Sequence, residues 1–339
     1  MRALAGTVLV LSTLCGCGGS TTTSGGSGGD TASGGSGGAG PLTLAVRRVF
    51  LGDTDENLNP DPNAWKELGV NVDGLLSTQT DAAHCKLQAG ASKTSVQGDG
   101  NGGIDNSWGK NVALVLASLA ESPTAKANDD IESGGSTLLI HVPSLGSGPN
   151  QTDLSAATYM AAPSAMPAWN GNDPRWASFE SVGSGDLKQP LTAFPGSALE
   201  NGVFSAAPPT TLLLPLGGGG LLLGHLRVHQ ARLFGTLNGS GSTAKVTGGI
   251  IAGVLATDDL VAELKAVAGS IDPTLCEGAT FESVAQQIRA ASDIMQDGTN
   301  GDPSKTCDGI SFGIGFDAVA VRLNGVAPKA PPLWDPCAK

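Results

Sequence analysis

The amino-acid sequence predicts a mainly β fold, a β-sandwich or jelly-roll-like single domain with two or three short helices. The chain contains 50 glycines and 20 prolines, and only 15% of its residues are charged. Short apolar runs alternate with turns rich in glycine, serine and threonine, which is typical of strands joined by tight loops rather than of a helical bundle. No internal repeat or second linker divides residues 41–339, so we expect one β-rich extracytoplasmic domain there.

The start of the chain matches the signal of a bacterial lipoprotein. A positively charged N-terminus precedes the apolar run Ala3–Leu14, which is too short to span a bilayer as a mature helix. We expect residues 1–16 to be removed as a signal peptide, because the small residue Gly16 precedes Cys17. Cys17 then becomes a lipidated N-terminus carrying acyl chains such as palmitate. Cys15 fits less well, since a leucine precedes it; an ordinary signal peptide cut elsewhere is the alternative.

Residues 17–40 predict a flexible tether. After Cys17 the segment is almost wholly glycine, serine and threonine, with Asp30 as its only charge. Such a segment behaves as a coil with a root-mean-square reach of about 25–30 Å. The residue after Cys17 is glycine rather than the aspartate expected of inner-membrane retention. We therefore expect a lipid-anchored protein of the cell envelope, at the outer membrane.

The net charge of −12 limits the classes of partner. An acidic chain of this kind argues against nucleic acid and against anionic lipid headgroups. Contact with the membrane is therefore expected through the N-terminal lipid. A glycan or a surface protein is the remaining kind of ligand.

Apolar runs place the first strands. Residues 42–51 predict the first strand, and residues 136–142 a later one with 157–162 as its partner. Residues 68–74 alternate briefly and end in a turn. The run 111–120 is so apolar that a buried helix or a strand fits, and we prefer the helix.

A hairpin is predicted from two apolar runs, 211–216 and 221–229, joined by four glycines. The glycines lack the Lys-Ser/Thr and the helix of a phosphate loop. Because side chains alternate along a strand, His225, Arg227 and His229 lie on one face. This stripe is a candidate anion-binding surface, or simply a solvated strand face. The two histidines lack the intervening glutamate of a zinc protease.

The C-terminal half continues with strands at 231–238 and 244–255. Thr257 is the expected cap of one helix, and residues 281–295 carry the apolar stripe of another. Residues 309–323 give the clearest strand pattern of the chain.

Two tryptophans, Trp169 and Trp176, fall in the stretch 165–179, whose prolines and polar residues predict a loop. Exposed aromatic side chains on loops stack on sugar rings. Both are therefore candidate glycan-binding residues. The alternative is that the two indoles cap the edge of the sandwich.

A glycine-rich acidic turn predicts a Ca²⁺ site. Asp99, Asn101 and Asp105 offer the hard oxygen ligands that Ca²⁺ prefers, and the intervening glycines let the backbone fold tightly. Asp73 or Asp81, from the preceding loop, is expected to complete the shell. The spacing is not that of an EF-hand, because Lys110 occupies the place of the final glutamate. The alternative is an Asx-rich surface turn without an ion.

Four cysteines remain after the lipidation signal: Cys85, Cys276, Cys307 and Cys337. An even number in an exported chain predicts two disulfides. We favour Cys276–Cys307, which brackets one helix and a loop, together with Cys85–Cys337. No Cys-x-x-Cys spacing is present, so zinc is not expected.

Several segments stand out together: Leu14–Cys17, the Gly/Ser-rich tether, Trp65 with Asn71–Gly74, Gly103–Asn106 and Cys307–Ser311. In this combination the chain resembles uncharacterised surface lipoproteins of the myxobacterial type. The resemblance covers most of the mature domain. It implies export, but no activity and no catalytic residue.

The leading functional hypothesis is a lipid-anchored cell-surface lipoprotein with a β-rich binding or structural domain, stabilised by Ca²⁺. The alternative is an exported glycan-active hydrolase that draws two carboxylates from Asp73, Asp99, Asp105 and Asp173. Glycosidases hold such a pair about 5–9.5 Å apart. The folded part of the chain contains no nucleophile elbow, because the Gly-x-Ser-x-Gly matches lie in the tether.

Overall fold

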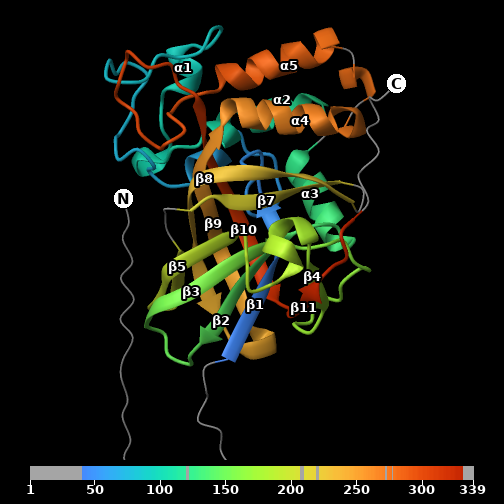
Figure 1. Cartoon of the computed structure of the whole chain (residues 1–339). Coiled ribbons are helices and arrows are strands. Elements are labelled where there is room, and N and C mark those ends of the chain that lie inside the picture. The colour runs from blue at the N-terminus through green and yellow to red at the C-terminus, as the bar shows by residue number, and fades with distance from the viewer. Residues whose placement is uncertain are drawn as a thin grey trace, which may run out of the picture. The chain divides into compact units, whose positions relative to one another are not determined.

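Eight antiparallel strands close into a barrel, seen in the computed structural model of the chain (Figure 1). The structure describes residues 40–330 except 120–121, 207–209, 219–220, 272 and 277. The expected signal peptide, Cys17 and nearly all of the tether therefore lie outside the described residues, as does Cys337. Within the described part of the chain, no helix has the length and apolar character needed to cross a membrane.

Around the barrel, the strands follow one another in sequence order, and the last pairs with the first. They are β1 (Gly40–Phe50), β2 (Leu138–Leu145), β3 (Gln151–Met160), β5 (Thr192–Glu200), β6 (Val203–Ala206), β8 (Leu221–Asn238), β9 (Lys245–Ala256) and β10 (Gly309–Ala320). Two pairings close the ring. β1 meets β10 with Leu44 opposite Ala320, and β6 meets β8 with Phe204 opposite Gly235.

Three further strands lie outside the ring. β7 (Leu212–Gly218) forms a hairpin with the first half of β8. β4 (Pro174–Ala177) and β11 (Arg322–Val326) form a small parallel pair.

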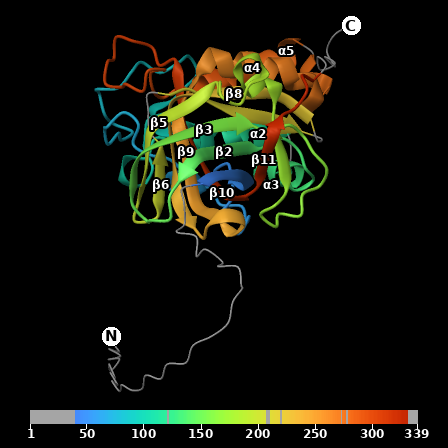
Figure 2. The same cartoon turned by 60° about the horizontal axis from the view of Figure 1, so that its bottom comes forward.

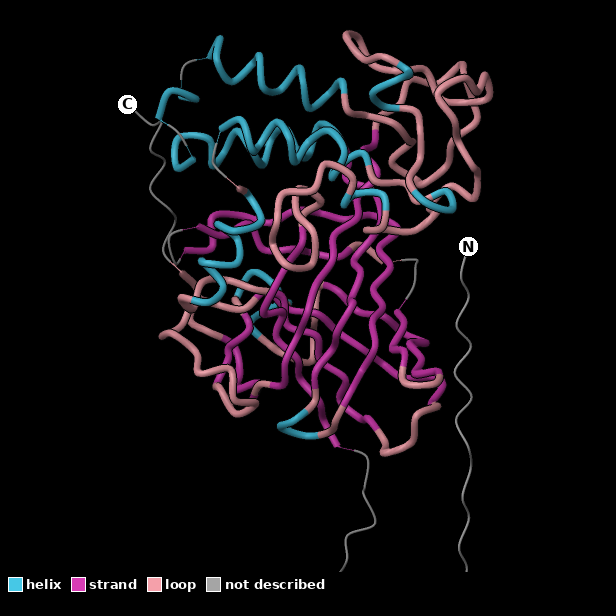
Figure 3. The backbone as a smooth tube through the Cα atoms, turned by 180° about the vertical axis from the view of Figure 1, so that it is seen from behind, coloured by secondary structure: helices cyan, strands magenta, loops and turns pink. Residues whose placement is uncertain are grey.

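Helices gather at one end of the barrel, as Figure 1 shows for α2, α4 and α5 and Figure 3 shows from behind. The α-helices are α1 (Lys93–Val96), α2 (Ala113–Leu119), α3 (Pro123–Glu132), α4 (Thr257–Ile271) and α5 (Gly278–Ala290). A π-helical turn, η3 (Trp108–Val112), leads into α2. The short 3₁₀ turns are η1 (Ala64–Lys66), η2 (Asn101–Gly103), η4 (Phe179–Ser181), η5 (Gly183–Gly185), η6 (Gly241–Thr243) and η7 (Pro273–Cys276).

The main core fills the barrel. All eight strands contribute alternate apolar side chains to it, such as Leu44 on β1, Phe194 on β5 and Phe316 on β10, and the core continues into the apolar sides of α4 and α5. Figure 2 shows the strands arranged around this centre. A second, smaller apolar cluster covers the outside of β1–β3. It includes Leu139 and Tyr159, which pack under the segment that carries β4.

The end of β1 extends beyond its pairing with β2, which stops at Ala45. Helix α3 supplies the hydrogen bonds there that a neighbouring strand would otherwise make. The side-chain amide of Asn128 donates to the carbonyl of Val49 at 3.0 Å and accepts from its N–H at 2.8 Å. The hydroxyl of Thr124 accepts from the N–H of Leu51 at 3.0 Å. These bonds satisfy the backbone of β1 and fix α3 against the barrel.

The predicted β-sandwich or jelly roll is wrong, because the sheet closes on itself. An alternating apolar pattern indicates that one face of each strand is buried. The pattern is the same whether that face packs on a second sheet or faces the inside of a barrel. Closure depends on β6, which spans Val203–Ala206 and has no strong pattern. The prediction of two or three helices was also too low, since the structure describes five α-helices.

Most of the predicted elements are confirmed. The strands expected at 42–51 and 136–142 are β1 and β2, and the 211–229 hairpin is β7 with β8. In the run 111–120, the described residues 111–119 are helical, as preferred. The helix expected at 281–295 ends earlier, at Ala290.

Candidate functional site

An apolar cavity of about 220 Å³ lies where the barrel interior meets the helices. Its wall is formed by five barrel strands, by β7 and by helices α2, α3 and α4. The lining side chains are mostly apolar and include Ile251 on β9 and Phe312 on β10; Asp130, Ser136 and Thr137 are the polar ones. An apolar cavity of 150 Å³ stays dry and binds benzene. By that scale, this cavity has room for a molecule of about nine non-hydrogen atoms.

Trp108 forms part of the cavity wall. Its ring meets Phe312 edge-on, with centroids 5.3 Å apart. The side chain is 4% exposed, and its indole N–H has no hydrogen-bond partner. Leaving a buried donor unpaired costs about 1–3 kcal/mol. The cavity therefore combines an apolar wall with a tryptophan whose N–H the protein does not satisfy, in a π-helical turn of the kind found at functional sites.

Next to Trp108 in the sequence, carboxyl groups converge from separate loops. Asp105 accepts from the backbone N–H of Val72 at 2.6 Å and of Asp73 at 3.3 Å. Asp99 accepts from the N–H of Ser77 at 2.5 Å. A hydrogen bond joins the Asp99 and Asp105 carboxyl groups. These bonds hold the loop that carries Asp73 against the acidic turn.

Asp293 and Lys110 complete this acidic cluster, which we define as Asp73, Asp99, Asp105, Asp293 and Lys110. Asp293 accepts from both the N–H and the hydroxyl of Ser311 on β10. The Ser311 hydroxyl accepts in turn from the N–H of Ser107 at 2.7 Å, one residue before Trp108. Lys110 donates to the carbonyl of Gly98 at 2.8 Å. The acidic cluster is thus bonded to the turn that lines the cavity.

Burial controls protonation in the acidic cluster. It raises the pKa of Asp105 to about 8, with further increases from the charges of Asp73, Asp293 and Asp99. It also raises the pKa of Asp99 to about 6 and that of Asp293 to about 7, although hydrogen bonds to both oppose the shift. Burial lowers the pKa of the Lys110 ammonium. At neutral pH Asp105 therefore retains its proton and donates to Asp99.

Of the four residues predicted to bind Ca²⁺, Asp73, Asp99 and Asp105 belong to the acidic cluster, but their carboxylate oxygens do not all lie within 4.8 Å of one another. Asp73, Asp99 and Asp105 influence each other's charge, and one Asp73 oxygen is buried without a partner. Asn101 lies apart, with its amide nitrogen 3.5 Å from Glu67. The sequence did not point to Asp293, because nothing in its local pattern marks it as a neighbour of Asp99.

Of the carboxylates considered for glycan hydrolysis, Asp173 is not part of the acidic cluster. Asp173 accepts from the N–H groups of Ala168 and Asn170, which closes a turn far along the chain from the acidic cluster. Asp99 and Asp105 are in direct hydrogen-bond contact, closer than the about 5–9.5 Å of glycosidase carboxylates.

The two candidate glycan-binding tryptophans are both partly buried. The ring of Trp169 lies between two guanidinium groups, 5.6 Å from Arg47 and 5.1 Å from Arg175. Trp176 is part of β4. Arg175 itself is fully buried and donates to Ser164 at 2.7 Å, while its Nε and Nη2 have no partner. The indole of Trp169, with guanidinium groups over its ring, is not an open stacking platform.

The predicted His-Arg-His stripe divides between two environments. His225 and Arg227 line an open groove of about 550 Å³ together with Lys329. Arg227 also pairs with Glu263 at 3.7 Å. His229 instead approaches Gln296. The alternation is confirmed, because the intervening Leu226 and Val228 are buried in the core.

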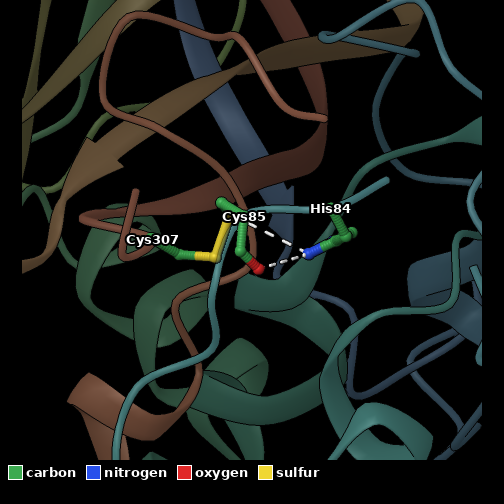
Figure 4. A group of neighbouring side chains, drawn as sticks. All are labelled: His84, Cys85 and Cys307. Atoms are coloured by element: carbon green, nitrogen blue, oxygen red, sulfur yellow. Dashed lines mark hydrogen bonds between the residues drawn. A yellow bond between two sulfur atoms is a disulfide. The ribbon is translucent and has the colours of Figure 1, made fainter. Parts of the chain in front are cut away.

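A disulfide joins Cys85 to Cys307 across a sequence separation of 222 residues (Figure 4). The favoured pairings Cys276–Cys307 and Cys85–Cys337 are therefore wrong. Nearness in sequence suggested Cys276–Cys307, and Cys85–Cys337 was the pair that remained. The fold instead places the loop of Cys85 beside the loop before β10, where Lys86 pairs with Thr306. Cys276 is also disulfide-bonded.

No family model, no curated protein and no solved structure matches this chain. The likeness to myxobacterial-type surface lipoproteins therefore stays a prediction. The cavity and Trp108 were missed by sequence reasoning. The available signal was a tryptophan directly after the acidic turn, followed by an apolar run that was interpreted only as core.

Proposed function

We propose that this chain is a lipid-anchored binding module of the cell envelope, whose barrel holds a small, mainly apolar molecule. The cavity beside Trp108 is the observation that carries this proposal. It is smaller than the about 300–1,000 Å³ of pockets for drug-sized ligands, so the ligand is compact. The unpaired N–H of Trp108 favours a ligand with one hydrogen-bond acceptor.

The ligand class is tested with two compounds of matched size, cumene and acetophenone, each of about nine non-hydrogen atoms. Acetophenone carries a carbonyl acceptor and cumene does not. We expect both to raise the melting temperature of the protein, because they bind the folded state only. Acetophenone should do so at lower concentration, since its carbonyl satisfies the indole N–H.

Two variants make this test specific. Trp108→Phe keeps the aromatic wall but removes the N–H, so it should abolish the preference for acetophenone over cumene. Ile251→Phe fills the cavity and should abolish stabilisation by both compounds. Trp65→Phe, at a buried tryptophan that does not line the cavity, is the control and should behave as the wild type. If neither compound stabilises the folded wild type up to its solubility limit, the proposal is overturned.

The anchor is tested separately. A Leu-Cys-Gly-Cys sequence followed by a glycine- and serine-rich segment supports lipidation at Cys17. Mass spectrometry of the N-terminal peptide from the native host should find a diacylated or triacylated cysteine. A mature N-terminus beyond Cys17 would contradict the anchor and leave the cavity proposal in place.

We also propose that Ca²⁺ stabilises the acidic cluster. The support is the mutual electrostatic influence of Asp73, Asp99 and Asp105 and the unpaired buried oxygen of Asp73; the three carboxylates have to move closer together to share an ion. Glycan hydrolysis has less support, because Asp99 and Asp105 are in contact and Asp173 closes a separate turn. An activity screen on glycans should therefore find no hydrolysis that Asp105→Asn removes.

A further inference from the structure

The Cys85–Cys307 disulfide has a histidine beside it (Figure 4). The Nδ1 atom of His84 lies 3.9 Å from the sulfur of Cys85. One ligand atom from each of His84, Cys85 and Cys307 lies within 4.8 Å of the other two, and among the described residues no other group of three or more His, Cys, Asp or Glu side chains meets this condition. In a tetrahedral zinc site with Zn–S of about 2.3 Å and Zn–N of about 2.0 Å, adjacent ligand atoms are about 3.6–3.8 Å apart. The distance from His84 Nδ1 to the Cys85 sulfur is thus close to that of two zinc ligands, whereas the two sulfurs, bonded to each other in the disulfide, have to separate first.

We propose that the chain, when this disulfide is reduced, binds Zn²⁺ through His84, Cys85 and Cys307, so that either a disulfide or a metal ion joins the two loops. This inference does not depend on the cavity or its ligand. A sequence search misses the site because the two cysteines are 222 residues apart rather than in a Cys-x-x-Cys pair.

Backbone bonds hold the two loops together without the disulfide. Lys86 donates to the carbonyl of Lys305 at 2.7 Å, and Cys307 donates to the carbonyl of Lys86 at 2.9 Å. The N–H of Cys85 donates to the side chain of Asn300 at 2.9 Å. Reduction therefore leaves the two sulfurs facing each other, and rotation of the two cysteine side chains has to separate them to the distance of two zinc ligands.

The chemistry balances with a dithiol reductant. The dithiol passes two electrons and two protons to the disulfide, becoming a cyclic disulfide itself and leaving two cysteine thiols. Zn²⁺ then replaces the two thiol protons, which are released to solvent. Two thiolates, one neutral imidazole and Zn²⁺ carry no net charge. Such a neutral group suits this location, where the three side chains are 5% exposed or less.

Metal binding changes the role of His84. Its Nδ1 lies 3.0 Å from the carbonyl of Cys85, and this hydrogen bond must be given up if Nδ1 is the ligand. The proton then resides on Nε2. Zinc with three protein ligands keeps a fourth position for water.

The experiment uses the full chain, reduced with a water-soluble phosphine, which does not offer sulfur to the metal. Titration with Co²⁺ should produce thiolate-to-cobalt charge-transfer absorption that saturates at one equivalent, and Zn²⁺ should displace the cobalt. His84→Asn should weaken Co²⁺ binding by at least about 10-fold. The double variant Cys85→Ser with Cys307→Ser should remove the charge-transfer band.

Matched controls are His141→Asn, at a half-buried histidine on β2, and Cys276→Ser; neither should change the titration. Absence of the band in reduced, folded wild type overturns the proposal, as does a titration that His84→Asn leaves unchanged. If the variants do not fold, X-ray absorption of the zinc-loaded wild type decides. Two sulfur and one nitrogen neighbours support the site, and any other protein ligand set refutes it.

Discussion

At the scale of single residues, the molecule buries several ionisable side chains. The acidic cluster holds four carboxyl groups with one partly buried lysine, and Asp105 is 4% exposed. Arg175 is fully buried beside Trp169. Each of these groups makes stability depend on its charge state or its partners.

The acidic cluster should make the protein less stable as the pH rises. The folded-state pKa values of Asp99, Asp293 and Asp105, about 6, 7 and 8, exceed the unfolded value, which is about 4. The folded state then holds more protons than the unfolded state between about pH 4 and pH 8, so the free energy of unfolding falls as pH rises through this window. Urea denaturation at pH 5 and pH 8 checks this.

Asp105→Asn should remove about half of that slope, because the amide oxygen still accepts from Val72 while the charge is gone and Asp99 and Asp293 still titrate. We expect a gain of about 2–4 kcal/mol at pH 8 and almost none at pH 5. Asp129→Asn, on an exposed face of α3, is the control. A pH slope as steep in Asp105→Asn as in the wild type would refute the assignment.

Ca²⁺ should compete with protons for the acidic cluster. At pH 8, millimolar Ca²⁺ should raise the melting temperature and a chelator should lower it, with the effect shrinking at pH 5. An extracellular site binding at about 0.1–1 mM contributes roughly 2.7 kcal/mol at 100 times its dissociation constant. Asp105→Ala should remove the response and Asp153→Asn should keep it. Identical melting curves with calcium and with chelator at pH 8 would refute the ion.

Arg175→Met should leave stability unchanged or increase it by about 1–4 kcal/mol, because the guanidinium is desolvated and two of its nitrogens are unpaired. Methionine keeps much of the packing against Trp169. Arg175→Ala should destabilise instead, since it opens a cavity. Thermal melts of both variants give the comparison. Equal destabilisation would mean that the guanidinium makes a favourable interaction that we have not identified.

At the scale of elements, β8 makes barrel closure possible. Its first half pairs with β7 and its second half with β6, and the change of partner falls at a bulge where Gln230 has a positive φ of 51°. Opposite the bulge, Gly253 on β9 has a φ of 157°. A Cβ atom there would lie 2.4 Å from the carbonyl oxygen of His229.

Gly253→Ala should therefore destabilise the protein by about 2–4 kcal/mol, since backbone atoms rather than a flexible side chain must move. Gly278→Ala, at the start of α5 where an added Cβ meets nothing, is the matched control and should be neutral or mildly stabilising. Chemical denaturation of both variants measures the difference. A neutral Gly253→Ala would show that the bulge relaxes without cost.

At the scale of the whole molecule, the sequence predicted most elements but not their assembly. The apolar periodicity of β1, β2 and β10 was sufficient to place them, because it is a local property. Closure was not predictable, since β6 is short and its pairing with Gly235 lies outside any local pattern. The acidic turn was found from its composition, whereas Asp293 joined it only through the fold.

Removing the Cys85–Cys307 disulfide should cost substantial stability. In the chain-entropy account, closing a loop of 222 residues restricts the unfolded chain by up to about 5 kcal/mol. The double variant Cys85→Ala with Cys307→Ala should lower the free energy of unfolding by about 2–5 kcal/mol. Peptide mapping of the unreduced protein checks the pairing directly. A peptide joining Cys276 to Cys307 would contradict it.

The pairing of β1 with β10 has a consequence for the order of folding. Strand β1 gains its first neighbour, β2, over a moderate sequence distance, but its other neighbour is the last strand of the ring. During synthesis or export from the N-terminus, one edge of β1 stays open until residues 309–320 arrive. An open strand edge is a template for pairing with other chains. The nascent barrel is thus exposed to aggregation for most of its synthesis, and long-range pairing of this kind also slows folding.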